Sequence, residues 1–243
     1  MAYLTVADLS ASADNLPILK KISFSVEKGS LTLIAGPNGS GKSYLLKCLK
    51  GLEKTDEGTI RVENKEMKTR KERMRFFGLV FQDTSLQIVG STVEKDIAFG
   101  LENQKRSTSE IKAKTDEMLS LFSLDKERKR NPGVLSGGER RRLCIAGVMA
   151  MESPVLLLDE PLANLDYPSV KMVLNTLVSL KEKGITVLVV SHEAEKLLAL
   201  TDNTIILRGG EIAASGKSRD MLQSLRDNDI YLPPLAFEDM KWI

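Results

Sequence analysis

Gly36-Pro37-Asn38-Gly39-Ser40-Gly41-Lys42-Ser43 is the stretch of sequence that decides the fold. It matches a glycine-rich phosphate loop, in which backbone N–H groups surround phosphate oxygens and a lysine reaches the terminal phosphates. Apolar residues 31–35 predict a buried strand before the loop, and residues 44–50 follow it with helical spacing that ends at Gly51. A plain Gly/Ser-rich turn is the alternative, but the two flanking elements favour a nucleotide phosphate site.

The bulk composition is that of a soluble globular protein. The chain has 243 residues, a hydrophobic content of 42%, a charged content of 28% and a net charge of +2. The basic clusters at residues 70–75 and 126–130 are interleaved with Glu72 and Glu127, which is typical of solvated helix faces. We therefore expect no nucleic acid among the partners.

The cysteines and the single histidine argue against a structural zinc site. Cys48 and Cys144 lie in apolar helical runs and are expected to be buried, reduced thiols. The amino-terminal residues do not have the pattern of a secretory signal. Apolar runs also stay short of the roughly 20 residues needed to span a bilayer. The sequence predicts a cytoplasmic protein.

The chain pattern changes twice along its length. Residues 3–9 and 22–26 alternate as half-buried strands and suggest an antiparallel pair before the loop. Residues 92–133 have mostly helical spacing and predict a helical insertion. The α/β pattern then returns, with strands expected at 155–158, 185–190, 204–207 and 211–214 and helices at 168–183 and 193–200.

Two carboxylates end the apolar run at residues 155–158. Unpaired buried charge is costly, and a metal-bound triphosphate would supply the missing partner. In that interpretation Asp159 holds Mg²⁺ and Glu160 polarises the attacking water as general base. The alternative is a helix N-cap Asp beside a solvated Glu.

His192 follows the predicted strand at residues 185–190. Taken alone, a single histidine is more often structural. Gly36, Asp159 and Gln82 also emerge at the carboxyl ends of predicted strands, where open α/β sheets bind their ligands. This convergence predicts that His192 hydrogen-bonds the γ-phosphate and the attacking water.

Leu135-Ser136-Gly137-Gly138-Glu139 precedes a helical run and predicts a second anion cradle. One triphosphate does not need two cradles from one chain. A two-fold dimer, in which each second cradle closes on the nucleotide of the other chain, is the economical solution. An ordinary glycine-containing N-cap is the alternative.

Taken together, these motifs resemble the ATP-binding-cassette (ABC) ATPases over roughly residues 3–225. The resemblance implies an α/β fold: a P-loop NTPase (RecA-like) core with a mixed sheet, an N-terminal antiparallel β subdomain and an inserted α-helical subdomain. The expected division is 1–90 and 134–226 for the core with its β subdomain, 91–133 for the helical part and 227–243 for a tail. The matching stretches, in chain order, are residues 36–43, Gln82, residues 135–139, residues 155–160, Asn164-Leu165-Asp166 and His192.

The resemblance also implies the site residues, with ATP and Mg²⁺ as cofactors. Gln82 would couple the Mg²⁺ site to a transmembrane subunit, Ser136 and Gly138 would contact the opposite chain's γ-phosphate, and Asp166 would communicate across the dimer. The implied nucleotide contacts are Gly36, Asn38, Gly39, Ser40, Gly41, Lys42, Ser43, Tyr44, Ser136, Gly137, Gly138 and Asp166. The implied catalytic residues are Glu160, His192 and Gln82, and the implied metal ligands are Ser43, Gln82 and Asp159.

Within that family, Gln87 and the run at residues 96–100 are similar to the energy-coupling-factor importers of vitamins or transition-metal ions. This implies a subunit that dimerises around two ATP with an identical or paralogous chain. It would lie peripherally on the inner face of the membrane through a transmembrane partner. Members usually stack adenine on an aromatic near the end of the first strand, but residues 9–13 have none. Stacking on Tyr3 and no stacking at all are the open alternatives.

Two further differences from the family pattern concern residue 139 and the tail. Glu139 stands where glutamine is commoner, and the tail is short for this subgroup. A soluble ABC clamp for repair or ribosome work is the rival function, although the sequence has no second cassette, coiled-coil insert or zinc module. A non-hydrolysing subunit is a third possibility, and intact Lys42, Asp159, Glu160 and His192 argue against it.

Overall fold

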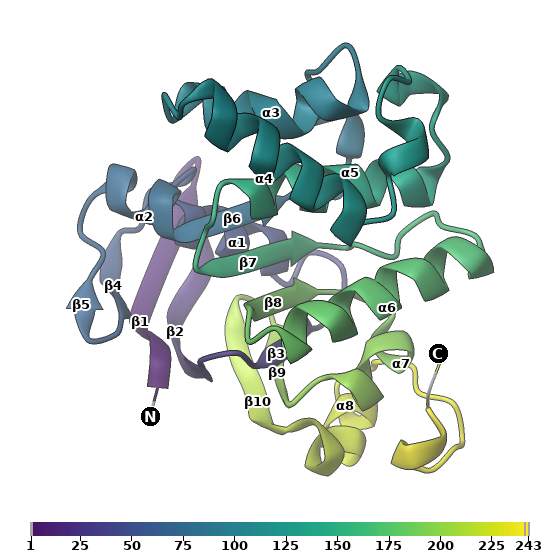
Figure 1. The fold of residues 1–243 in the computed structure, drawn as a ribbon. Helices are drawn as coiled ribbons and strands as arrows, with labels where there is room; N and C mark the ends of the chain where they lie inside the picture. Colours follow the sequence, from purple (N-terminus) through teal and green to yellow (C-terminus); the bar gives the residue numbers. More distant parts are fainter. Residues whose placement is uncertain (1, 241, 243) are drawn as a thin grey trace.

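Two β-sheets form the framework of the molecule in the computed structural model, which describes residues 2–240 and 242 (Figure 1). The smaller sheet is antiparallel, with strand order β2-β1-β4-β5. Its strands are β1 (Ala2–Ala13), β2 (Leu16–Glu27), β4 (Glu57–Val62) and β5 (Lys65–Glu66). The expected antiparallel pair is therefore present, and it is longer than predicted because the buried/exposed alternation of β1 continues through Ser10 and Ser12 to the turn at Asp14 and Asn15.

The larger sheet is mixed and has the strand order β10-β9-β3-β8-β7-β6. All neighbours in it are parallel except β9 and β10, which form the expected glycine-turn hairpin. Every residue of β3, β7 and β8 is buried, as in parallel strands covered on both faces. The strands are β3 (Leu31–Ala35), β6 (Phe77–Val80), β7 (Val155–Asp159), β8 (Thr186–Val190), β9 (Asn203–Arg208) and β10 (Glu211–Lys217).

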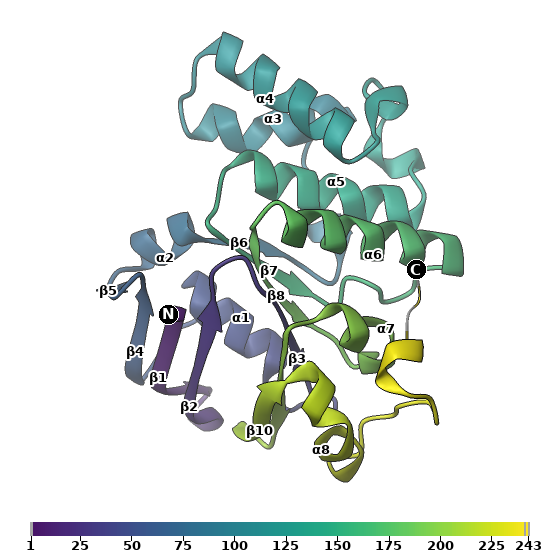
Figure 2. The same cartoon turned by 60° about the horizontal axis from the view of Figure 1, so that its bottom comes forward.

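Helices and the small sheet cover the two faces of the larger sheet (Figures 1 and 2). The α-helices are α1 (Lys42–Lys50), α2 (Arg70–Phe76), α3 (Val93–Asn103), α4 (Thr108–Leu121), α5 (Gly137–Ala150), α6 (Tyr167–Glu182), α7 (Ala194–Leu197) and α8 (Leu222–Asp227). Short 3₁₀ helices are η1 (Thr84–Leu86), η2 (Asp125–Glu127), η3 (Pro132–Val134), η4 (Leu198–Leu200), η5 (Ser218–Met221) and η6 (Phe237–Asp239).

Alternate side chains of the central strands contribute to two hydrophobic clusters. Leu156 and Leu158 of β7 pack with α3, α4, α5 and α6 on one face. Val155 and Leu157 pack with α1 and the small sheet on the other face. The mixed sheet between these layers confirms the α/β fold class. Successive side chains of a strand point to opposite faces, so a strand covered on both faces needs apolar residues at every position, as β7 has.

The segment expected to be helical contains α3, α4, η2 and η3. Thr92 caps α3, and a capping box between Ser107 and Glu110 begins α4. The helix expected at residues 193–200 is shorter than predicted. It tightens after Leu197 into η4, and Ala194 and Leu197 of α7 and Leu198 of η4 are buried. The division of the chain into subdomains stays a prediction.

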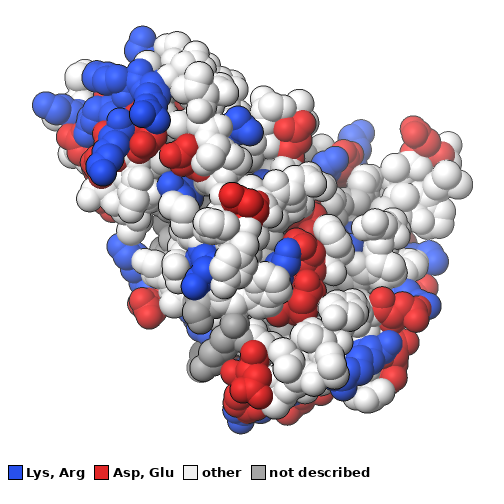
Figure 3. All heavy atoms as spheres, turned by 90° about the vertical axis from the view of Figure 1, so that its right-hand side faces the viewer, with Lys and Arg blue, Asp and Glu red and all other residues white. Residues whose placement is uncertain are grey.

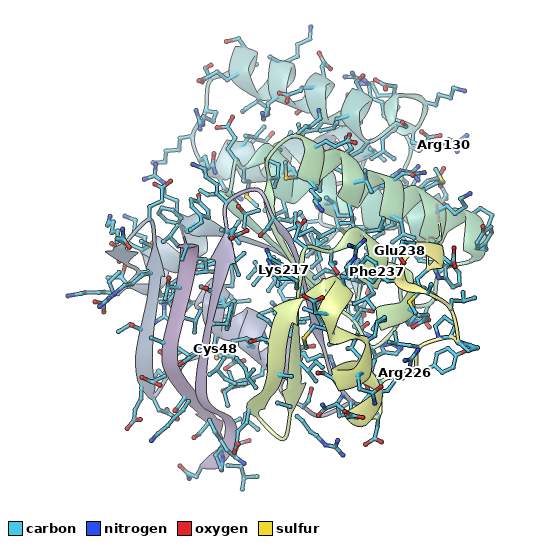
Figure 4. The ribbon with its side chains drawn as sticks, turned by 90° about the horizontal axis from the view of Figure 1, so that it is seen from below. Cys48, Arg130, Lys217, Arg226, Phe237 and Glu238 are labelled. Atoms are coloured by element: carbon cyan, nitrogen blue, oxygen red, sulfur yellow. The ribbon has the colours of Figure 1, made fainter. Side chains whose placement is uncertain are left out.

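The C-terminal segment, expected as a tail at residues 227–243, packs on the core. Ile230, Leu232 and Met240 are buried in the cluster with α6 and α7. Glu238 accepts a hydrogen bond from the Arg219 guanidinium at 2.9 Å, beside Phe237 (Figure 4). Farther along, the ring of Trp242 lies 6.0 Å from that of Tyr167.

Charged side chains of both signs are mixed over the face of the molecule in Figure 3, with one basic cluster at its upper left. Arg128 and Lys129, from one of the basic runs, pair with acidic residues such as Glu94, and α2 buries no residue. Both observations fit the interpretation of these runs as solvated faces. Among residues 2–240 and 242, no helix combines the length and apolar character needed to cross a membrane.

Candidate functional site

A cavity of about 420 Å³ opens where β3, β7 and β8 end. This is the edge at which the sequence predicted that polar residues converge. The lining residues are Ile18, Asn38, Gly39, Ser40, Gly41, Lys42, Ser43, Tyr44, Gln82, Glu160 and His192.

Glycine is required at both ends of the phosphate loop. Gly36 has a φ of 151°, and a Cβ on it would lie 2.1 Å from the Leu207 carbonyl oxygen. Gly41, the N-cap of α1, has a φ of 98°, and a Cβ there would lie 2.9 Å from the Leu19 side chain. The loop is therefore folded tightly between β9 and β2, with its backbone available to an anion at the start of α1.

Lys42 is buried within this loop. Its Nζ donates to the carbonyl oxygens of Gly36 at 2.7 Å and Pro37 at 3.0 Å. Burial lowers the pKa of Lys42, and the nearby Glu160 and Asp159 carboxylates oppose that shift. A positive charge held among backbone N–H groups is suited to a phosphate chain.

The Ser43 hydroxyl donates to Asp159 Oδ1 at 2.8 Å. Burial raises the pKa of the Asp159 carboxyl; the hydrogen bond from Ser43 opposes this shift and Glu160 adds to it. The described residues contain no group of three His, Cys, Asp or Glu side chains suited to a metal. The oxygens of Ser43, Asp159 and Gln82 nevertheless match what Mg²⁺ prefers when phosphate oxygens complete its shell. The donor set therefore fits the predicted metal.

Glu160 is 6% exposed and has a φ of 46°, which is unusual for a non-glycine residue. Its carboxylate accepts the backbone N–H of His192 at 3.0 Å and lies 2.9 Å from His192 Nδ1. The alternative of an N-cap Asp beside a solvated Glu is wrong, because Asp159 ends β7 and Glu160 is buried. His192 itself is half exposed, so its ring is free to meet a ligand.

A buried arginine fixes the loop that carries Gln82. Arg141 of α5 donates to the carbonyl oxygens of Phe81 at 2.8 Å and Gln82 at 3.0 Å. The Gln87 side chain accepts from the Phe81 N–H at 3.1 Å, which closes the loop on itself. Sequence reasoning missed Arg141, because it stands between Arg140 and Arg142 and nothing in the sequence marks it as the buried contact of the Gln82 loop.

The second cradle lies apart from this cavity. Ser136 caps α5 and forms a reciprocal capping box with Glu139. Within its own chain, Ser136 therefore acts as the ordinary N-cap that was the alternative to an anion cradle. A Cβ on Gly138 would lie 2.7 Å from Ser169 Oγ, in the first turn of the helix that Asp166 caps. The cradle and Asp166 are therefore neighbours, and none of these residues is among those lining the cavity.

Tyr3 does not reach the cavity either. It lies near the start of β1, with Lys28 Nζ 5.1 Å from its ring centroid, whereas the other end of β1 approaches α1. The alternative of adenine stacking on Tyr3 is therefore wrong. The remaining role assignments stay predictions.

The fold and cavity together define a P-loop nucleotide-binding protein. The ABC transporter family model matches residues 19–163, more than half of the chain, and the chain belongs to that family. It is accordingly an ATP-binding subunit that hydrolyses ATP.

Relatives of known type extend over most of the chain. It is 35% identical over 206 residues to the energy-coupling factor transporter ATP-binding protein EcfA1 of Streptococcus pneumoniae, covering 84% of this chain and 74% of that protein. It is 36% identical over 219 residues to a probable sulfate/thiosulfate import ATP-binding protein CysA of Chlorella vulgaris, covering 90% and 92%. The solved structure of cbiO1 from Clostridium perfringens, part of the transporter complex cbiONQ, superposes with a TM-score of 0.85 at 31% identity over 93% and 94% of the two chains.

Proposed function

We propose that two such ATPase chains close around two ATP molecules and drive a membrane importer. The observation that carries the dimer is the position of Ser136 beside the helix capped by Asp166, outside the cavity of its own chain. A second chain would bring this cradle to the γ-phosphate, and the partner is an identical or a paralogous ABC ATPase chain. The nucleotide then becomes part of the interface.

The importer assignment follows from the relatives. EcfA1 is named for energy-coupling factor transport, CysA for sulfate or thiosulfate import, and cbiO1 belongs to the complex cbiONQ. The proposed cargo class is a vitamin or a transition-metal ion, as the Gln87 pattern suggests. The chain would lie on the inner face of the membrane, held there by a transmembrane subunit.

Hydrolysis in this proposal uses Glu160 as general base. A water oxygen forms a bond to the γ-phosphorus, the bond to the leaving ADP oxygen breaks, and the water proton passes to the Glu160 carboxylate. The His192 N–H holds that carboxylate in place, and the exposed His192 ring would turn to the γ-phosphate. Lys42 and the loop N–H groups neutralise the phosphate oxygens.

Ser43, Asp159 and Gln82 would hold Mg²⁺. The ion supplies charge neutralisation for the β- and γ-phosphate oxygens. Because Asp159 is buried, a bound cation would stabilise its ionised form against the effect of burial.

The transmembrane partner would dock beside the Gln82 loop. Large apolar side chains are exposed there: Leu86 at 76%, Val89 at 59% and Phe99 at 47%. They come from η1, the segment after it and α3, and Arg141 links the Gln82 loop to α5. A partner bound to this surface would contact the loop that carries Gln82, so a movement of Gln82 would be transmitted to it.

Docking is tested by pull-down from native membranes. The double variant Leu86→Ser/Phe99→Ser should lose its membrane partner while keeping ATP binding. Leu16→Ser, equally apolar and exposed but at the turn of the small sheet, is the control. Unchanged capture by the double variant, or capture of ribosomes or nucleic acid in place of a membrane protein, would contradict the importer.

The dimer is tested by disulfide trapping between chains. Asn38 and Ser136 are both exposed, and the native thiols are buried, so Asn38→Cys/Ser136→Cys in a Glu160→Gln background offers one specific pair. We expect a covalent dimer that requires ATP. Asn38→Cys/Ser107→Cys, with its second thiol at the cap of α4, should give none. Equal cross-linking with and without ATP would overturn the arrangement.

A further inference from the structure

The cavity around the phosphate loop has two chemically different sides. Gln82, Glu160 and His192, which come from the large sheet, make one side polar. Ile18 of β2 and Tyr44 of α1 make the side toward the small sheet apolar, and Tyr44 supplies the one six-membered aromatic ring among the described residues that line the cavity. A nucleotide has the same division between its phosphates and its base.

The Tyr44 ring is fixed at both ends. Its backbone belongs to the first turn of α1, directly after Ser43, and its hydroxyl donates to the Ser12 carbonyl oxygen at 2.8 Å. Ser12 lies near the end of β1, opposite Pro17 of β2. The ring therefore bridges the gap between the phosphate loop and the β1–β2 hairpin, and little conformational freedom remains for it to lose when a ligand binds.

The hairpin also sits close to the loop. A Cβ on Gly41 would lie 3.2 Å from the Ile18 carbonyl oxygen, so the backbone of β2 borders the start of α1. A triphosphate bound by Lys42 and Ser43 must direct its nucleoside away from Glu160 and His192. The direction that remains within the cavity leads along Tyr44 and Ile18.

We propose that Tyr44 is the platform on which the nucleotide base stacks, with Ile18 as the second apolar contact. The proposal rests on the nucleotide site described under the proposed function and adds the base to it. An aromatic face accepts the flat face of a purine without needing a particular hydrogen-bond pattern. The platform belongs to the phosphate-loop helix, and the end of β1 contributes only the carbonyl oxygen that holds the ring.

The test compares ATP with inorganic tripolyphosphate, which carries phosphates without a base. Calorimetry is done with the full chain and Mg²⁺ on Tyr44→Leu and Tyr44→Phe. Base–aromatic stacking of about 1–3 kcal/mol corresponds to a loss of about 5-fold or more. We expect Tyr44→Leu to lose ATP affinity by at least this factor and to bind tripolyphosphate as the wild type does. Tyr44→Phe keeps the ring and should stay within about 3-fold for both ligands.

A second readout locates the base directly. Photolysis with 8-azido-ATP should label the peptide that contains Tyr44 in the wild type. Equal losses of ATP and tripolyphosphate affinity in Tyr44→Leu, or no loss of either, would overturn the platform while leaving the phosphate site intact. A wild-type chain that binds neither ligand would overturn the nucleotide site and the platform together.

Discussion

The Glu160 carboxylate lies 2.9 Å from His192 Nδ1 and also accepts the backbone N–H of His192 at 3.0 Å. The neighbouring parallel strands β7 and β8 of the mixed sheet therefore bring a candidate base and the group that orients it to the same edge. In this orientation Glu160 has a left-handed backbone conformation, which is unfavourable for a non-glycine residue.

Glu160→Gln should reduce ATP hydrolysis by at least about 100-fold, because a general base contributes about 10²–10⁴-fold. The amide keeps the hydrogen bond from the His192 N–H, so ATP binding should persist and the closed dimer should accumulate. Steady-state phosphate release and light scattering with ATP measure the two effects. Undiminished turnover would remove Glu160 from the role of base.

Lys42→Ala should weaken ATP binding by about 10-fold or more, since a hydrogen bond to a charged group contributes about 1.5–3 kcal/mol. Calorimetry of wild type and variant gives the ratio. Lys65→Ala removes an exposed lysine of β5 and is the matched control. An unchanged dissociation constant for Lys42→Ala would contradict the phosphate loop as the binding site.

Arg141→Met should loosen the Gln82 loop without touching the phosphate loop. The carbonyl oxygens of Phe81 and Gln82 would lose their guanidinium donors. Hydrogen exchange at residues 81–90 should accelerate, and ATPase activity should fall more than ATP affinity. Arg130→Met, at an exposed surface position, should leave both unchanged. Unaltered exchange in Arg141→Met would mean that other contacts fix the loop.

Both thiols should resist alkylation in the native protein. Burial raises the pKa of Cys48 and of Cys144 to about 12, so almost no thiolate exists at pH 8. Iodoacetamide followed by mass spectrometry should find neither residue modified until urea unfolds the chain. Rapid labelling of either thiol at pH 8 would show that its helix opens locally.

Local sequence patterns predicted those site residues that stand directly at or after the carboxyl end of a strand. Glu160 and His192 lie in contact because they come just after β7 and β8, and parallel neighbours present their carboxyl ends at one edge of the sheet. The same reasoning placed the phosphate loop after β3. Fold class followed from the alternation of apolar strands with amphipathic helices.

Other features depend on distant contacts that no short pattern encodes. Arg141 reaches Gln82 across 59 residues of sequence. Tyr3 has an aromatic ring that could stack on a base, but it lies at the end of β1 that is far from the phosphate loop. The length and register of β1 determine that position, and no short sequence pattern encodes them. The C-terminal segment packs on the core through a few apolar side chains, such as Ile230 and Met240. These residues are too widely spaced to form a helical or strand pattern that would predict the contact.

The ring of Trp242 lies 6.0 Å from that of Tyr167 in a tilted arrangement. Lys196 Nζ also lies 5.3 Å from the Trp242 ring, so this side chain touches the helix that follows Asp166 and the one that follows His192. An affinity tag or fluorescent protein fused after Trp242 would lie close to α6 and α7. The amino-terminal strand begins on another side of the molecule (Figure 1), so a label placed there stays away from α6 and α7.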